Sequence, residues 1–254
     1  MGITKMRIVH ISDLYICEKD SDDPAAIVMI ENLRKCIAHF NALEPAPDLL
    51  LVTGNITSNG SIESAMHARE LLDTLDFPYK LVCGPNDDRR TTLTVFDHAC
   101  GNEVGGVVSY MVEGFALRLI GLDSLGHNGT GGHICQKRLN WVNDRLAENM
   151  TQPTAIFMHH PPMKTGIAKI DEDGFNNAEY FGQLVAHYSH IKAIFCGHIN
   201  FACHTGWNET VVSSAPGMGI NPMLDDEGVA DTPAYNLHRF TEYGDVISRT
   251  IYLS

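Results

Sequence analysis

Short runs of consecutive apolar residues alternate along the chain with segments whose apolar residues recur at helical spacing. The runs at Met6–Ile11, Leu49–Thr53 and 79–83 predict buried strands, because a strand inside a parallel sheet is apolar on both faces. Between these runs, apolar residues three and four positions apart predict two helices, one opening at Asp23-Pro24 and one capped by Ser61. The resulting β-α-β-α-β order predicts a layered α/β core.

The second half of the chain returns to this alternation after an interruption. Two apolar segments, 107–113 and 115–122, flank Gly114 and predict a β-hairpin. Helices are predicted at 135–146 and 177–188, and strands at 154–158, 191–196, 235–240 and 246–253. Because no repeat or linker divides the chain, we expect a single domain over 1–254. Its fold class is α/β, a two-layer β-sheet sandwich flanked by helices, with the terminal strands entering the second sheet.

Composition narrows the range of partners. The chain has 18 basic and 31 acidic residues and a net charge of −13, which argues against nucleic acid or an anionic membrane as the main partner. An anionic ligand would therefore need a metal ion or helix N-termini to bind. No apolar run is long enough to span a membrane, and seven scattered cysteines without a C-x-x-C motif indicate reduced thiols. These features predict a cytoplasmic protein.

Five predicted strands end in polar clusters made only of Asp, Asn and His: Asp13, Asn55, Asn86-Asp87, His159-His160 and His198. Ligand sites of α/β proteins lie beyond the carboxyl ends of the strands. Oxygen and imidazole ligands of these types bind divalent metals or phosphate. Any single cluster is equally well explained as turn residues that cap a strand. The set of five favours a metal or phosphate site.

The order of these clusters resembles that of the calcineurin-like metallophosphoesterases, whose motifs run D-x-H, G-D, G-N-H-D, H-x-P and G-H-x-H. The likeness is carried by ISDLY, CGPNDDR, MHHPPMKTG and FCGHIN, and it covers nearly the whole chain. It points to the bacterial branch that contains class III cyclic-nucleotide phosphodiesterases and glycerophosphodiesterases. The resemblance implies the calcineurin-like fold and metal-dependent phosphodiester hydrolysis. It also suggests a homodimer, and 205–254, which adds strands, is the segment we expect to supply the contact.

The same resemblance shows that the motifs are incomplete. Asp13, Asp87, His159 and His198 match the family, whereas five other motif positions carry residues that the family does not use there: Tyr15, Asn55, Pro85, Asn86 and Asn200. Tyr15 and Asn200 replace histidine ligands, and Asn55 replaces the aspartate that bridges two metal ions. Pro85 replaces an asparagine ligand, and Asn86 replaces the histidine that contacts the phosphate.

By this resemblance, one metal position would contain Asp13, Tyr15, Asn55 and Asn200. The other would contain Asn55, His159 and His198, with Asn86 as a substitute ligand if the turn shifts by one residue. Asn86, Asp87 and His160 remain as catalytic candidates. Two divalent ions need anionic ligands between them, and only Asp13 offers a permanent negative charge. We therefore expect at most one divalent ion (Mn, Fe or Zn) per chain, or none.

Two functions stay open. One is a phosphodiesterase-type hydrolase with weak activity, and the other is a non-catalytic descendant that binds a small phosphorylated ligand or a protein. Asp→Asn is also a common deliberate change, so an engineered inactive variant is a third reading, although five substitutions that include a proline favour natural drift. A comparison of metal content and turnover separates these alternatives.

Several other polar residues are expected to lie outside the site. His10, within a strand, is expected to be structural, whereas a further group of histidines is expected to be solvated: His127, His133, His187, His190 and His204. Asp123-Ser124 has no histidine at a supportive local spacing, which argues against a nucleophile pair. Arg89-Arg90 is interpreted as either an anion contact or a surface pair. The glycine-rich segment 129–132 lacks the Lys-Ser/Thr of a P-loop.

Overall fold

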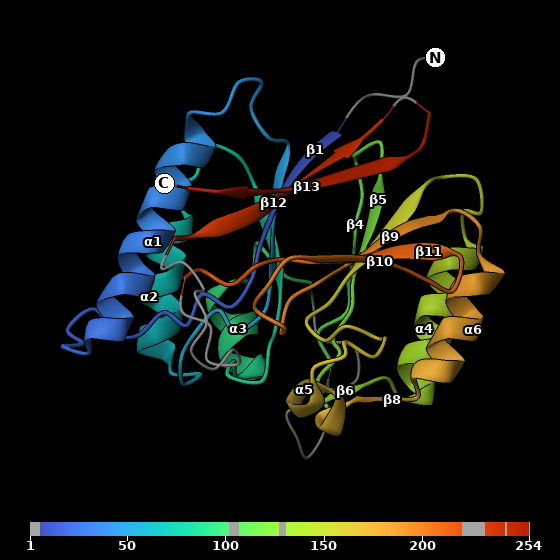
Figure 1. The fold of residues 1–254 in the computed structure, drawn as a ribbon, viewed down its shortest axis with the longest axis horizontal. Helices are drawn as coiled ribbons and strands as arrows, with labels where there is room; N and C mark the ends of the chain where they lie inside the picture. The colour runs from blue at the N-terminus through green and yellow to red at the C-terminus, as the bar shows by residue number, and fades with distance from the viewer. Residues whose placement is uncertain (1–5, 102–106, 127–130, 220–231, 242, 254) are drawn as a thin grey trace.

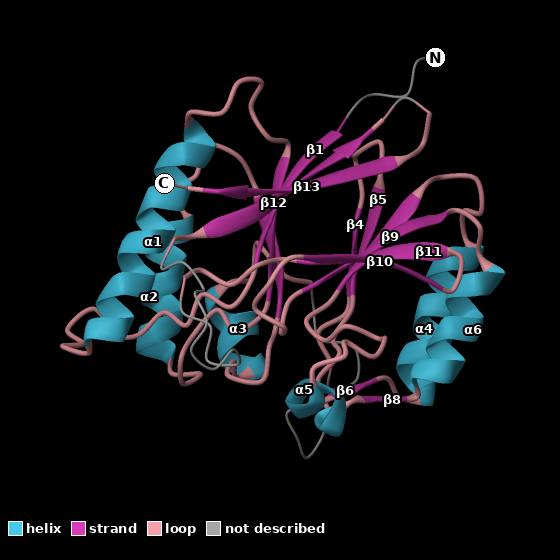
Figure 2. Cartoon of the chain, in the orientation of Figure 1, coloured by secondary structure: helices cyan, strands magenta, loops and turns pink. Residues whose placement is uncertain are grey.

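The computed structural model describes residues 6–101, 107–126, 131–219, 232–241 and 243–253 of the chain (Figure 1). Two mixed β-sheets stack face to face, and helices cover their outer faces (Figure 2). The predicted α/β sandwich is therefore confirmed. Among the described residues, no helix is both long enough and apolar enough to cross a bilayer.

The first sheet has the strand order β13-β12-β1-β2-β3. Its parallel strands are β1 (Met6–Ile11), β2 (Leu49–Thr53) and β3 (Tyr79–Val82), as predicted. The terminal strands β12 (Ala234–Phe240) and β13 (Val246–Tyr252) join this sheet antiparallel to β1. The expectation that the terminal strands enter the second sheet is wrong. The free edge of β1 needs a hydrogen-bonding partner, and β12 supplies it.

The second sheet has the order β10-β11-β9-β7-β5-β4. Two antiparallel pairs form its edges, β4 (Tyr110–Val112) with β5 (Arg118–Gly121), and β10 (Cys203–Trp207) with β11 (Thr210–Ser214). The parallel strands β7 (Thr154–Phe157) and β9 (Ile191–Cys196) lie between them. The predicted hairpin around Gly114 is confirmed, whereas β10 was not predicted.

The helices α1 (Pro24–Asn41), α2 (Ile62–Leu72) and α3 (Arg89–Val95) lie on the side of the first sheet, and α4 (Gln136–Ala147) and α6 (Ala178–His187) on the side of the second (Figure 1). Both predicted caps are present. The Asp23 carboxylate accepts from the N–H of Ala25 at 2.9 Å, and Ser61 Oγ accepts from the N–H of Ser64 at 3.1 Å. The short helix α5 (Ala168–Asp173) and the strands β6 (Gly132–His133) and β8 (Phe175–Asn176) form a small unit beyond the strand ends.

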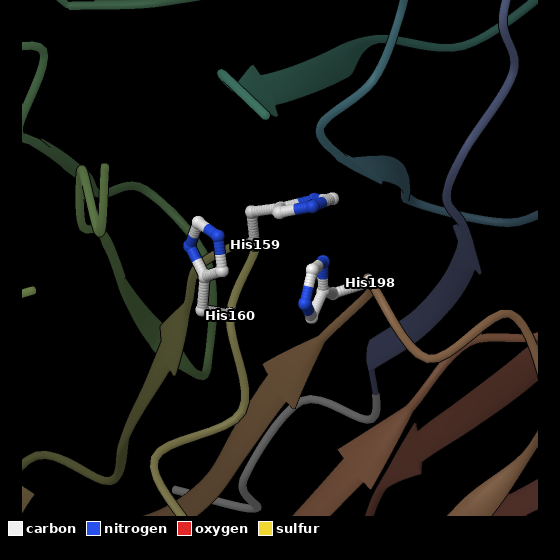
Figure 3. A group of neighbouring side chains, drawn as sticks. All are labelled: His159, His160 and His198. Carbon is white, nitrogen blue, oxygen red and sulfur yellow. The ribbon is translucent and has the colours of Figure 1, made fainter. Parts of the chain in front are cut away.

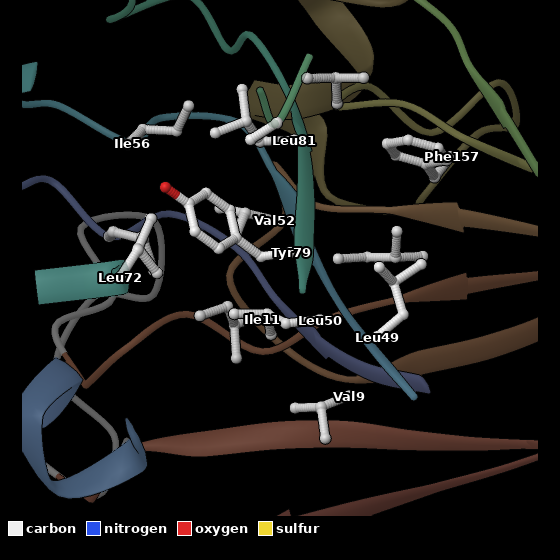
Figure 4. Close-up of a cluster of buried hydrophobic side chains, with 14 of the residues drawn as sticks. Val9, Ile11, Leu49, Leu50, Val52, Ile56, Leu72, Tyr79, Leu81 and Phe157 are labelled. Carbon is white, nitrogen blue, oxygen red and sulfur yellow. The ribbon is translucent and has the colours of Figure 1, made fainter. Parts of the chain in front are cut away.

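The larger hydrophobic core lies around the first sheet. Its strands pack apolar side chains such as Val52 and Leu81 against Leu72 of α2, and Phe157 of β7 joins from the second sheet (Figure 4). His10 is fully buried in this interior, where Nε2 lies 2.9 Å from Thr53 Oγ1 and Nδ1 lies 3.1 Å from His238 Nε2. The structural role predicted for His10 is confirmed.

Candidate functional site

Loops that follow β1, β2, β3, β7 and β9 meet at one end of the sandwich and bring the polar clusters together. Five non-glycine residues in these loops have left-handed backbone conformations: Asp13 (φ 59°), Tyr15 (φ 48°), Asn55 (φ 48°), His198 (φ 71°) and Asn200 (φ 58°). Such conformations are unfavourable for side chains with a Cβ and concentrate at functional sites. The backbone at this end of the sandwich is therefore held in an uncommon shape.

The loops also approach one another closely. A Cβ on Gly54, whose φ is 92°, would lie 2.5 Å from Nδ1 of His159. A Cβ on Gly84 would collide with the backbone nitrogen and the side chain of Asn55. Only glycine fits at these two positions, because each loop leaves no volume for a side chain.

Asp13, Tyr15 and Asn55 form a hydrogen-bonded triad. Asn55 Nδ2 donates to Asp13 Oδ1 at 2.8 Å and to the Tyr15 hydroxyl oxygen at 3.1 Å, and the Tyr15 hydroxyl donates to Asp13 Oδ1 at 3.3 Å. The orientation of the amide follows from the backbone N–H of Asn86, which donates to Asn55 Oδ1 at 3.0 Å. A backbone nitrogen can only donate, so Oδ1 must face it and Nδ2 must face the carboxylate.

Burial and charge act together on this triad. Burial raises the pKa of the Asp13 carboxyl, and hydrogen bonds from Ser12 and Asn55 lower it again. The backbone N–H of His198 donates to Asp13 Oδ2 at 3.0 Å, so both carboxyl oxygens have partners. Burial also raises the pKa of the Tyr15 phenol, and the Asp13 carboxylate raises it further. Tyr15 therefore stays protonated and acts as a donor.

The side chain of His159 presents a nitrogen with a free lone pair. Its Nδ1 donates to the carbonyl oxygen of Thr53 at 2.6 Å, which fixes the tautomer and leaves Nε2 as the acceptor. Nε2 is buried and has no hydrogen-bond partner among the described residues. Burial lowers the pKa of His159 far below the usual histidine range, so the ring is neutral.

Three buried histidines lie together at this point: His159, His160 and His198 (Figure 3). Each can offer one ring nitrogen such that the three atoms lie within 4.8 Å of one another. The ring centroids are 4.7–5.1 Å apart. The predicted metal residues His159 and His198 are thus neighbours, and His160, which the sequence assigned to catalysis, joins them.

Ser124 also belongs to this region. Its Oγ lies 2.9 Å from His160 Nδ1 and accepts from the backbone N–H of His160 at 3.1 Å. No histidine lies at a supportive local spacing from Asp123-Ser124, but the fold brings His160 beside Ser124 from a distant part of the chain. Gly121 and Phe157 are paired on β5 and β7, and Ser124 and His160 each follow three residues later. The pairing of these two strands was the signal that local spacing missed.

The carboxylate of Asp87 is surrounded by hydrogen-bond donors from neighbouring loops. Its carboxylate accepts from the backbone N–H groups of Gly84, Ile56 and Thr57 and from the Thr57 hydroxyl, at 2.8–3.1 Å. Asp87 therefore joins the loops after β2 and β3.

Asn86 has an exposed side chain, which donates to the carbonyl of Ser58 at 3.0 Å. The catalytic roles of Asp87 and Asn86 stay predictions.

The remaining candidates have mixed outcomes. Arg89 forms a two-point ion pair with buried Asp123, with N···O distances of 2.6 and 3.0 Å, so its guanidinium is already paired with a carboxylate. Asn200 Nδ2 donates to the carbonyl of His198, while its buried Oδ1 has no partner in the described part of the chain. His187 and His204 are exposed as expected.

His190 differs from the expectation of a solvated side chain. It is buried and packs edge to face against Tyr188, because it lies directly before β9 where the chain enters the sheet. His133 is half-buried in β6, and His127 lies outside the described residues.

These contacts test whether the site suits two metal ions or one. At the first position, the Asn55 amide directs N–H bonds toward Asp13 and Tyr15, where a metal would require lone pairs. A dinuclear centre does not fit these residues. At the second position, the unpartnered Nε2 of His159 lies beside two further imidazoles, so a single ion fits there.

Comparisons with known proteins agree with this architecture. The family model described as calcineurin-like phosphoesterase matches residues 6–200. A probable glycerophosphodiester phosphodiesterase, GpdQ, of Arcobacter nitrofigilis is 30% identical over 98% of this chain and 93% of its own. The 3',5'-cyclic adenosine monophosphate phosphodiesterase CpdA of Escherichia coli K12 is 21% identical, with 85% and 77% covered. The crystal structure of a dimetal phosphatase from Danio rerio has the same fold, with a TM-score of 0.71 and 13% identity over the full length of both chains.

Proposed function

Because the chain belongs to the calcineurin-like phosphoesterase family, we propose that it binds a phosphodiester in the ancestral cleft and that two-metal hydrolysis is weak or lost. Relatives named as glycerophosphodiester and cyclic-nucleotide phosphodiesterases suggest the ligand class. Metal use is a property of the family, so this proposal concerns how many ions this chain retains and what they support.

One observation carries the proposal, namely the amide of Asn55 directed at Asp13 and Tyr15. Two divalent ions about 3.5–4 Å apart repel by roughly 18 kcal/mol at an effective dielectric constant of about 20. An anionic bridge offsets that repulsion, and a neutral amide does not. Here the amide also fills the space between the ligands with its own hydrogen bonds.

The chain also lacks the family's histidine that could donate a proton to the leaving group. The side chain of Asn86 stands where the family has a histidine, and an amide cannot release a proton to a leaving group. A divalent ion held by His159 and His198 would supply Lewis-acid polarisation of a phosphoryl oxygen. The chain's own residues would orient the phosphodiester without assisting departure of the alcohol. Binding is therefore better supported than turnover.

A second candidate function is a slow phosphodiesterase that works with one ion. It is favoured by the cluster of His159, His160 and His198 and by the unpartnered Nε2 of His159. This candidate differs from the first in requiring metal-dependent turnover by the wild-type protein.

The test compares the wild type with a variant in which five positions are restored to the family's residues: Tyr15→His, Asn55→Asp, Pro85→Asn, Asn86→His and Asn200→His. Hydrolysis of bis-p-nitrophenyl phosphate is measured with and without Mn²⁺, and metal content is measured by elemental analysis. We expect negligible wild-type turnover and at most one ion, whereas the restored variant should bind two ions and hydrolyse the substrate. Robust Mn²⁺-dependent turnover by the wild type would overturn the proposal.

Three further expectations accompany this function. The net charge of −13 favours a small phosphorylated ligand held locally over nucleic acid or an anionic membrane. The second expectation is a cytoplasmic location, and the third is a homodimer whose contact lies in 205–254. Light scattering of the purified protein checks the dimer, and a monomer at micromolar concentration would contradict it.

A further inference from the structure

The three histidines of the site share a geometry that differs from the two metal positions implied by the family motifs. In those motifs His159 and His198 are the histidine ligands of one position, together with an aspartate at position 55 and an asparagine at position 85. Here residue 55 is an amide whose oxygen accepts from the N–H of Asn86 and whose nitrogen faces Asp13. The ligands available beside His159 and His198 therefore include the ring of His160.

The spacing of the three rings suits a common ion. A tetrahedral ion with metal–nitrogen bonds of about 2.0–2.1 Å requires nitrogens roughly 3.3 Å apart. The candidate nitrogens all lie within 4.8 Å of one another, so binding a common ion would require rotations of the side chains that shorten these separations. The rings come from two neighbouring strand ends, after β7 and after β9 (Figure 3).

Hydrogen bonds outside the cluster orient two of the rings. His159 donates to the carbonyl of Thr53, which also accepts from Ser12 Oγ at 3.0 Å. His160 contacts Ser124 Oγ at 2.9 Å. Metal-binding histidines generally use their second nitrogen in this way, which fixes the ring and the tautomer.

The chemistry of the donors sets the metal preference. Among the described residues this group contains imidazoles and no carboxylate, and the nearby Asp13 is occupied by donors from Asn55 and His198. Imidazole ligands suit Zn²⁺, Cu²⁺, Ni²⁺ and Fe²⁺, whereas Mn²⁺ and Mg²⁺ prefer carboxylate, carbonyl and water.

From this geometry we infer that His159, His160 and His198 form a mononuclear three-imidazole site that selects Zn²⁺ over Mn²⁺ and Mg²⁺. The inference rests on the proposed function in so far as both place a single ion in the cleft. It adds His160 as the third ligand and names the metal.

The experiment titrates metal-free protein with Zn²⁺ against a coloured chelator. We expect one Zn²⁺ per chain, with Mn²⁺ at least about 100-fold weaker. His160→Gln should weaken Zn²⁺ binding at least about tenfold, as should His159→Gln and His198→Gln. The matched control is His190→Gln, because His190 is also buried, its Nε2 has no hydrogen-bond partner within the described ranges, and it lies outside the cluster. That variant should bind Zn²⁺ as the wild type does.

A second measurement does not depend on variants that fold. X-ray absorption of the Zn²⁺-loaded wild type counts the imidazole ligands, and three are expected. Two imidazoles, unchanged Zn²⁺ affinity in a folded His160→Gln variant, or preference for Mn²⁺ would overturn the inference. None of these results bears on whether the wild type hydrolyses phosphodiesters. The proposed function is tested separately, by the hydrolysis assay described above.

Discussion

Nδ2 of Asn55 lies 2.8 Å from Oδ1 of Asp13, and this amide–carboxylate hydrogen bond joins the loops that follow β1 and β2. The same two positions in the family carry aspartates that share metal ions. In this chain a hydrogen bond links the two side chains. The proposed loss of a metal ion at this position has several measurable consequences.

Asn55→Asp alone should destabilise the protein. The new carboxylate would lie beside the buried Asp13, and leaving buried charge uncompensated costs about 3–5 kcal/mol. A divalent cation should recover part of this loss in the variant and have little effect on the wild type. Urea unfolding with and without Mn²⁺ measures both effects.

The control for this variant is Asn59→Asp. Asn59 Nδ2 donates to Glu18 Oε1 at 2.9 Å in the same kind of pair, but at an exposed position. Water screens the repulsion from Glu18, so the loss of stability should be much smaller than for Asn55→Asp. Equal losses in the two variants would show that burial of Asp13 does not matter.

Asp87→Asn should destabilise the protein by about 2–4 kcal/mol, because an amide nitrogen would then face donors that now point at a carboxylate. Asp88→Asn is the matched control. Asp88 is the N-cap of α3 and accepts from Thr91 N–H at 2.7 Å, a role that Asn performs equally well. Thermal unfolding compares the two variants, and similar midpoints would contradict the structural role of Asp87.

Acid should unfold the protein through its buried histidines. Burial lowers the pKa of His10 from 6.5 to about 3. Below pH 6.5 the unfolded chain binds a proton that the folded chain does not, so this contribution to stability is present above pH 6.5 and falls continuously until about pH 3. For His10 the loss amounts to about 2 kcal/mol at pH ~5.

His10→Gln should therefore reduce the slope of unfolding free energy against pH by about 1 kcal/mol per pH unit between pH ~6 and ~4.5. The slope depends only on how many more protons the unfolded state binds than the folded state, so it reports on His10 even if the variant also changes the absolute stability. His187→Gln changes an exposed histidine and should leave the slope unaltered. An unchanged slope for His10→Gln would mean that His10 is charged in the folded state.

Asp123→Asn should cost about 3–5 kcal/mol, because Asp123 is fully buried between two arginines. The ion pair with Arg89 is bidentate, and Arg138 approaches the same carboxylate at 3.6 Å. Glu70→Gln removes the exposed ion pair with Lys19 and should have a much smaller effect, because water screens that pair. Equal unfolding free energies for the two variants would contradict the expected contribution of burial.

The sequence predicted those parts of the molecule whose signal is local. Buried strands have apolar runs, and helix starts have caps, so β1, β2 and α1 could be recognised from short windows. Which sheet a strand joins depends on partners far away in the chain. For that reason β12 and β13 were recognised as strands but assigned to the wrong sheet.

The same division holds for the site. The motif residues Asp13, His159 and His198 were located correctly as strand-end neighbours, because motif order carries that information. The pairing of Ser124 with His160 depends on the register of two strands and was missed. Orientation of the Asn55 amide depends on a single backbone N–H of another loop, which no sequence pattern encodes.

Asp13, Asn55 and His198 hold left-handed conformations, and their side chains or backbone meet at the candidate site. The shape of the site is thus set by the main chain as well as by the side chains. New side chains at these positions would start from a backbone that the fold already holds in place. This makes the chain a natural scaffold for the design of metal sites, with the conformational cost of pre-organisation already met by the fold.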